Sequence, residues 1–199
     1  MKVNYSKRII IVISSPSGAG KTSVCRKLIE RDKSIALSIS DTTRSPRDNE
    51  IDGVDYNFIN EVEFKNRIKI KSYIEYANVF GNFYGSKHEN IINNFKRGRD
   101  ILFDIDWQGA KQLKNSSFNN SIVSIFIVPP SKEAIYQRLK SRAITSGDNE
   151  QAIESRMKKY ETEMKHKNDY DYVVTNDKLE ACVDELLKII KNKRKNLID

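Results

Sequence analysis

Apolar and polar positions alternate along this 199-residue chain in two different rhythms. Uninterrupted runs rich in β-branched residues, such as residues 8–13, are typical of strands that are covered on both faces. Apolar residues at helical spacing, as in residues 22–31, predict amphipathic helices. Because buried strands and helices alternate at both ends of the chain, the pattern predicts a parallel α/β core.

The predicted elements cover most of the sequence, and the central stretch has strands but few helices, so we interpret it as an insertion. The polar, arginine-bearing segment 41–55 is predicted to be a loop. Strands are expected over residues 8–13, 35–40, 56–59, 73–80, 82–86, 100–106, 122–128 and 171–175. Helices are expected over residues 22–31, 62–70, 88–95, 132–142, 150–167 and 178–191.

A glycine-rich segment with the letters SPSGAGKT occupies residues 15–22, between the first predicted strand and the first predicted helix. A strand, a tight turn and a helix N-terminus present several backbone N–H groups to one anion, as a phosphate-binding loop does. Ser15 stands where the usual pattern has its first glycine, a position that shapes the turn more than it contacts phosphate. In such a loop Lys21 reaches the β- and γ-phosphates and the Thr22 hydroxyl ligates Mg²⁺.

The composition fits one domain with insertions, because 199 residues with 38% hydrophobic content can bury a real core. No stretch approaches the roughly 18 apolar residues of a membrane span, and the segment before the first strand is too short for a signal peptide. Cys25 and Cys182 lie far apart in predicted helices, and His88 and His166 are isolated, so neither a disulfide framework nor a metal-ligand spacing is predicted. We therefore expect a cytoplasmic protein with no membrane partner.

The net charge of +8 raises a second possibility, which is nucleic-acid binding. The basic residues are scattered, and the basic run 191–195 is interpreted as a solvated helix end that suits the helix dipole. No helix-turn-helix, zinc-finger or RNA-binding signature accompanies the charge. A cleft for phosphorylated small molecules explains a basic surface equally well, so no nucleic-acid partner is predicted.

Seven short motifs in a fixed order make the chain similar to the guanylate kinase family over nearly its full length. They are SPSGAGKT at 15–22, SDTTRSPR at 40–47, GVDYNF at 53–58, YIEYA at 73–77, GNFYGS at 81–86, DIDWQG at 104–109 and VTND at 174–177. This resemblance implies a P-loop NTPase fold with a five-stranded parallel core, an inserted mixed α/β nucleotide-monophosphate domain and a helical lid. The implied ranges are 1–33, 97–136 and 168–199 for the core, 34–96 for the insertion and 137–167 for the lid.

The resemblance also implies the reaction, which is Mg²⁺-dependent transfer of the γ-phosphoryl group of ATP to GMP or dGMP in purine nucleotide metabolism and GMP recycling. The protein is expected to be a monomer or a homodimer. Catalytic roles are expected for Lys21, Arg44 and the lid arginines Arg138, Arg142 and Arg156. ATP binding is expected at Ser15, Pro16, Ser17, Gly18, Ala19, Gly20, Lys21, Thr22, Ser23 and Asn176. Magnesium is expected on Thr22 and, through a water molecule, on Asp104.

The residues implied for GMP suit its chemistry. Guanidinium groups bind phosphate oxygens bidentately, and a carboxylate accepts from both N1–H and N2–H of guanine. For Glu75 an alternative is a salt bridge across a hairpin, for example to Lys71. The implied set is Ser40, Arg44, Arg47, Tyr56, Glu75, Tyr84, Ser86, Asp104 and Asp106.

Two other function classes fit parts of this pattern. One is a non-catalytic scaffold domain of the same fold that binds phosphopeptides, although such domains have typically lost the P-loop lysine or the lid arginines, which this chain has. The other is a P-loop kinase for a different phosphorylated metabolite, such as a ribose bisphosphate, which would not need Glu75 and Ser86 in a guanine pocket.

Overall fold

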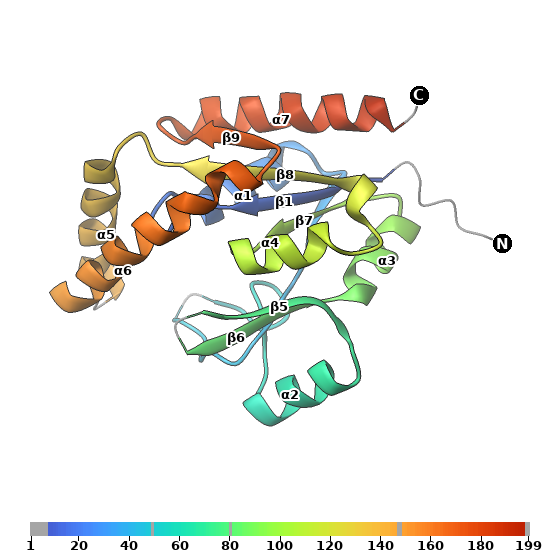
Figure 1. Ribbon diagram of the computed structural model, residues 1–199, viewed down its shortest axis with the longest axis horizontal. Helices are drawn as coiled ribbons and strands as arrows, with labels where there is room; N and C mark the ends of the chain where they lie inside the picture. The colour runs from blue at the N-terminus through green and yellow to red at the C-terminus, as the bar shows by residue number, and fades with distance from the viewer. Residues whose placement is uncertain (1–7, 49, 80, 147–148, 198–199) are drawn as a thin grey trace.

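A five-stranded, all-parallel sheet forms the centre of the protein (Figure 1). The computed structural model describes residues 8–48, 50–79, 81–146 and 149–197, and within them no side chain of 142–146 or 152. The strands, in spatial order, are β2 (Ile35–Leu37), β7 (Asp100–Asp104), β1 (Ile10–Ser14), β8 (Ile122–Val128) and β9 (Tyr172–Thr175).

Helices cover both faces of this sheet, which explains why its central strands are apolar without interruption. Ile11 and Ile13 of β1 belong to a cluster with α1 (Lys21–Arg31) and α7 (Leu179–Asn196). Ile10 and Val12 point to the opposite face, where they belong to a cluster with α3 (His88–Lys96) and α4 (Trp107–Lys114). The alternation of a strand thus feeds two separate apolar layers.

A second, smaller sheet lies below the core in Figure 1 and has mixed strand directions. Its order is β4 (Asn57–Phe58), β3 (Asp41–Thr42), β6 (Asn82–Lys87) and β5 (Tyr73–Val79), and α2 (Glu61–Lys69) lies beside it. Asp41 is fully buried in this unit and receives hydrogen bonds from Asn57, Arg67 and the Tyr73 hydroxyl. A buried carboxylate is tolerated only when it is paired in this way.

Two helices, α5 (Lys132–Ser146) and α6 (Glu150–Met164), project from one end of the core (Figure 1). They share a small apolar cluster made of Ile135, Leu139 and Ile153. Two 3₁₀ turns complete the structure, η1 (Asn119–Ser121) before β8 and η2 (Lys165–Asp169) after α6.

The core strands and most helices lie where the apolar pattern predicts them, but three expectations were wrong. Segment 41–55, expected to be a loop, contains β3, which pairs with both β4 and β6. The strand expected over 35–40 ends at Leu37. The strand expected over 100–106 ends at Asp104, because Asp106 accepts hydrogen bonds from the Gln108 and Gly109 N–H groups and so begins α4, a helix that was not predicted.

The basic C-terminal run is not only a solvated helix end. Arg194 reaches back to the edge of the sheet, where its Nε donates to Asp100 at 2.6 Å and its Nη1 to Asp32 at 2.8 Å. Asp100 is 1% exposed and also accepts from the backbone N–H of Ile9 at 3.0 Å. The carboxylate therefore needs a cation, and α7 supplies it. Among the described residues, no helix is both long enough and apolar enough to cross a membrane.

Replacing Arg194 by Met should lower the free energy of unfolding by about 2 kcal/mol, because it removes charge-assisted hydrogen bonds from a buried carboxylate. Chemical denaturation measures this difference. Lys195→Met, at the neighbouring exposed position, serves as the control and should stay within about 0.5 kcal/mol of the parent. Equal stability of both variants would show that Asp100 does not depend on Arg194.

Candidate functional site

The glycine-rich loop connects β1 to α1, as the sequence predicts, and its backbone requires glycine at two positions. Gly18 and Gly20 have φ angles of +86° and +87°, in the left-handed region that side chains with a Cβ rarely adopt. The Ser15 hydroxyl donates to the Pro16 carbonyl at 3.0 Å, so the residue that replaces the usual glycine helps to close the turn. The loop therefore turns sharply into the N-terminus of α1.

Lys21 begins α1, and its ammonium group binds the carboxylate of Asp104 and the carbonyl of Ile105, the latter at 3.2 Å. β1 and β7 place them together, because Ile13 pairs with Asp104 in the parallel register. Burial alone would lower the pKa of Lys21, but the charge of Asp104 outweighs it and raises the pKa above its ordinary value. Lys21 is therefore a permanent cation at the end of the loop.

A cavity of about 760 Å³ lies along the whole loop, and its floor is held by residues from the far end of the chain. The amide of Asn176, which is 6% exposed, donates to the Ala19 carbonyl at 2.8 Å. Arg138 of α5 donates to the carbonyls of Asn176 and Ala19 at 3.0 and 3.4 Å. Both side chains thus fix the loop backbone, and Asn176 also lines the cavity.

A carboxylate that the sequence analysis did not single out also contacts this loop. Glu163, at the end of α6, is 8% exposed and accepts a hydrogen bond from the Ser17 N–H at 3.0 Å. Burial raises the pKa of Glu163, while the Ser17 N–H and the charge of Lys159, 3.7 Å away, favour the ionised form. The two residues are 146 positions apart in the sequence.

A second cavity, of about 240 Å³, shares Ser17, Lys21 and Asp106 with the first. Glu75 of β5 lines it and is 3% exposed. Its neighbour across the sheet is Ser86 of β6, whose hydroxyl is 2.9 Å from that of Ser40. Burial raises the pKa of Glu75 to about 7, opposed by hydrogen bonding from Ser86 and reinforced by the charge of Asp106.

Glu75 also lies against the first turn of α4. A Cβ added at Gly109 would overlap the Glu75 carboxylate, so only glycine at this position allows the approach. The N-terminus of a helix carries a partial positive charge, which favours a carboxylate there. Asp106, at the N-cap of the same helix, is bonded to Gln108 and Gly109 and faces the same cavity.

The two predicted arginines are held by a carboxylate that the sequence analysis missed. Glu50, with 10% of its side chain exposed, accepts from Arg44 Nη2 at 2.8 Å and from the Arg47 N–H at 2.9 Å. Burial works against its ionisation, but the hydrogen bonds from Arg44 and Arg47 lower the pKa of Glu50 below its ordinary value. Arg44 also donates through Nε to the Tyr84 hydroxyl at 3.2 Å. Burial, with repulsion from Asp104, raises the pKa of Tyr56 to about 12, so its phenol stays protonated.

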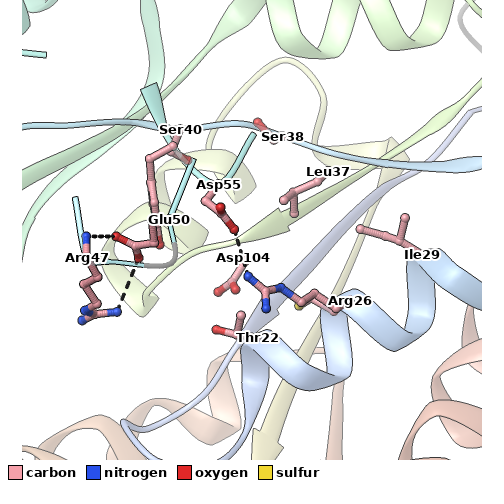
Figure 2. Close-up of a pocket in the computed structure, with 12 residues that line it drawn as sticks. Thr22, Arg26, Ile29, Leu37, Ser38, Ser40, Arg47, Glu50, Asp55 and Asp104 are labelled. Atoms are coloured by element: carbon pink, nitrogen blue, oxygen red, sulfur yellow. Dashed lines mark hydrogen bonds and ion pairs between the residues drawn. The ribbon is translucent and has the colours of Figure 1, made fainter. Parts of the chain in front are cut away.

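Figure 2 shows how the inserted unit meets the core at a third cavity, of about 230 Å³. Arg26 on α1 donates to Asp55 at 2.9 Å, and Asp55 in turn accepts from the Ile51 N–H. Arg47 and Glu50 lie across the same cavity from Thr22 and Asp104. The predicted magnesium ligands and the predicted phosphate-binding arginines therefore line one space.

The structure brings most of the predicted site residues to these three adjoining cavities, with two exceptions. Arg156 of α6 lines the Glu75 cavity, whereas Arg138 points to the loop carbonyls instead. The side chain of Arg142 lies outside the described residues. Glu50, Asp55, Gly109 and Glu163 were not foreseen. Only Glu50 had a local signal, since an acid three residues after Arg47 can cap that turn.

An all-parallel five-stranded sheet with a glycine-rich loop between its first strand and first helix defines the P-loop NTPase fold. A family model described as guanylate kinase matches residues 7–193. The chain is 45% identical over 190 residues to the guanylate kinase of Rickettsia bellii (strain RML369-C), covering 96% of this chain and 97% of that protein. It is 45% identical over 186 residues to that of Jannaschia sp. (strain CCS1), covering 94% and 84%.

A solved structure agrees with these matches. The crystal structure of guanylate kinase from Anaplasma phagocytophilum superposes with a TM-score of 0.76 at 36% identity, covering 94% of this chain and 86% of that chain. This chain belongs to the guanylate kinase family.

The buried charge of Glu75 predicts a pH-dependent stability. In the unfolded chain the carboxyl titrates near 4.5, but in the folded protein its pKa is about 7. Because the folded state holds the proton more tightly, Glu75 costs stability as the pH rises from about 4.5 to 7, and the full shift corresponds to about 3 kcal/mol.

Glu75→Gln should therefore raise the melting temperature at pH 8 and have little effect at pH 4.5. Thermal unfolding at both pH values measures this. A salt bridge from Glu75 to Lys71 predicts the opposite, which is a lower melting temperature at pH 8.

Proposed function

We propose that this protein transfers the γ-phosphoryl group of ATP to GMP or dGMP, giving ADP and GDP or dGDP. The observation that carries the proposal is that a buried glutamate pocket and the phosphate-binding loop meet at Lys21. Lys21 and Ser17 line both cavities, so a donor along the loop and an acceptor against Glu75 would have their phosphates side by side. Bringing two repelling phosphates together is the main task of a phosphoryl-transfer site.

Guanine fits the acceptor pocket by its hydrogen-bond pattern. Ionised Glu75 can accept from N1–H and N2–H, and the Ser86 and Ser40 hydroxyls, which already contact each other, can donate to O6. Adenine lacks the N1 proton and carries an amino group in place of O6, which would leave buried acceptors without partners. A site built in this way can discriminate by ~10⁴ or more. Asp106 faces the same pocket and is a further acceptor for the base.

The acceptor phosphate is assigned to Arg44, Arg47, Tyr56 and Tyr84. The link between Arg44 and Tyr84 and the shared contacts of both arginines with Glu50 hold these groups in one unit. Protonated phenols donate directed hydrogen bonds, and guanidinium forks match phosphate oxygens. In the reaction Arg44 would also stabilise charge on the transferring group.

The ATP phosphates are assigned to the loop N–H groups of Ser15 to Ser23 and to Lys21. Since the ammonium of Lys21 binds Asp104, phosphate binding requires that it exchange this partner or share it. Asn176 and Arg138 keep the loop in shape, and Asn176 lies on the adenine side of the donor cavity in this assignment. Arg156 and Arg142 would close over the transferring group.

Magnesium fits the donor set near the loop. Thr22 is exposed in the first turn of α1 and lines one cavity with Asp104. Among the described residues there is no group of three or more His, Cys, Asp or Glu that could hold a metal by itself, which suits an ion bound mainly by nucleotide phosphates and water. When bound, Mg²⁺ neutralises charge on the β- and γ-phosphates. Thr22 would be a direct ligand and Asp104 would act through a water molecule.

We assign the core, the acceptor-binding insertion and the lid to the ranges expected from the sequence, with residues 34–96 and 137–167 moving toward the core when both substrates bind. Cytoplasmic purine nucleotide metabolism is the setting in which we place the enzyme. Two unpaired, buried cysteines, Cys25 and Cys182, support a reducing compartment. We keep a monomer or homodimer as the expected assembly.

The two other function classes have less support. A non-catalytic scaffold domain would not need Lys21 to be held as a cation at the end of the loop. A kinase for a ribose phosphate would not need a buried carboxylate such as Glu75, whose burial is costly unless a ligand uses it.

A panel of acceptors tests the proposed reaction. With ATP and Mg²⁺ the protein should turn over GMP with a kcat/KM at least ~10³-fold above that for AMP or ribose 5-phosphate. Glu75→Gln should lower kcat/KM for GMP at least ~10-fold, since a charge-assisted hydrogen bond is worth about 1.5–3 kcal/mol, and leave the KM for ATP within about twofold. A preference for another acceptor would overturn the assignment of guanine.

Lys21→Ala should abolish measurable turnover while GMP binding by calorimetry stays within about threefold, because Lys21 serves the transferring phosphates. Lys27→Ala, in the same helix but away from the loop, is the control and should keep parental turnover. Near-normal turnover of Lys21→Ala would contradict the loop assignment.

A further inference from the structure

The attachment of α6 to the phosphate-binding loop has a consequence for the lid. Glu163 is buried to 8% exposure, and its carboxylate accepts from the Ser17 N–H at 3.0 Å. Ser17 lines both the donor cavity and the acceptor cavity. The C-terminal end of a lid helix is thereby fixed to the point where the two cavities meet.

Arg156 stands seven residues before Glu163 in the same helix. Seven residues make almost two full turns, so the two side chains leave the helix within about 20° of each other and about 10 Å apart along its axis. One face of α6 therefore carries both, and the structure places them accordingly. Glu163 lines the donor cavity and Arg156 lines the acceptor cavity.

Apolar packing alone would leave this face free to rotate or slide. The cluster shared by α5 and α6 is small, with Ile135, Leu139 and Ile153 buried in it. Leu139 also packs near Gly18 of the loop, at 3.3 Å from where a Cβ would lie. Apolar contacts are non-directional, whereas a hydrogen bond from a backbone N–H to a buried carboxylate fixes the rotation of the helix.

We propose that Glu163 is a positioning residue, whose hydrogen bond to the Ser17 N–H anchors α6 on the phosphate-binding loop and so holds Arg156 over the acceptor pocket. The proposal rests on the proposed phosphoryl transfer, in which Arg156 contacts the transferring group. Glu163 itself touches no reacting atom in it. The role requires an acceptor at the right reach, and it does not require a negative charge.

Steady-state kinetics of Glu163 variants separates reach from charge. Glu163→Ala should lower kcat at least tenfold, with the KM values for both substrates within threefold of the parent. Glu163→Gln keeps a carbonyl acceptor at the same reach and should hold kcat within threefold. Glu163→Asp keeps the charge but is one methylene shorter, and should lose at least fivefold. Glu154→Ala, at an exposed position of the same helix, is the matched control.

A double-mutant cycle with Arg156 tests the route of the effect. If Glu163 acts through Arg156, Glu163→Ala should cause less than a twofold further loss of kcat in an Arg156→Ala background. Loss of the same size in both backgrounds would overturn the proposal, since it would mean that Glu163 supports the loop itself. Equal loss in the Gln and Ala variants would overturn it as well.

Two further readouts keep the test decisive. Melting temperatures identify a variant that is unfolded at the assay temperature, and if Glu163→Ala is, the cycle is run with Glu163→Asp. All rates are taken with the acceptor that the parent protein uses best. Failure of the proposed function would thus appear as a preference for an acceptor other than GMP, whereas failure of the present proposal appears as additivity in the cycle.

Discussion

The parallel register of β1 against β7 is the constraint on which the site depends. It places Ile13 opposite Asp104, so the loop that leaves β1 begins beside the acidic end of β7. Ligands of open parallel sheets bind at this carboxyl edge, where consecutive strands release their chains in different directions. A slip of one residue would exchange the two faces of β1 and would separate Lys21 from Asp104.

Around that edge, each group expected to meet a phosphate is already held by a carboxylate of the chain. Asp104 holds Lys21, Glu50 holds Arg44, and Glu163 holds the Ser17 N–H. Substrate binding is therefore an exchange or sharing of partners in an already organised set of charges. Such organisation lowers the cost of orienting the side chains when the phosphates arrive.

The sequence predicted the parts of the structure that local patterns encode. The core strands follow from continuous β-branched runs, and the loop at 15–22 follows from a motif whose glycines are needed for positive φ. β3 was missed because a two-residue strand centred on Asp41 has no local signal, since its burial depends on Arg67 and Tyr73. The contact of Glu163 with Ser17 spans 146 positions, and only the folded chain reveals it.

The close approach of Glu75 to Gly109 makes base recognition a joint property of β5 and α4. A mutation that enlarges residue 109 displaces the carboxylate, and a mutation of Glu75 leaves an unfilled space beside a glycine. Neither single step gives a working pocket of another shape. A descendant of this chain that adopts a different base would therefore have to change both elements together, and evolutionary drift in specificity should be slow at this pocket even where its rim varies freely.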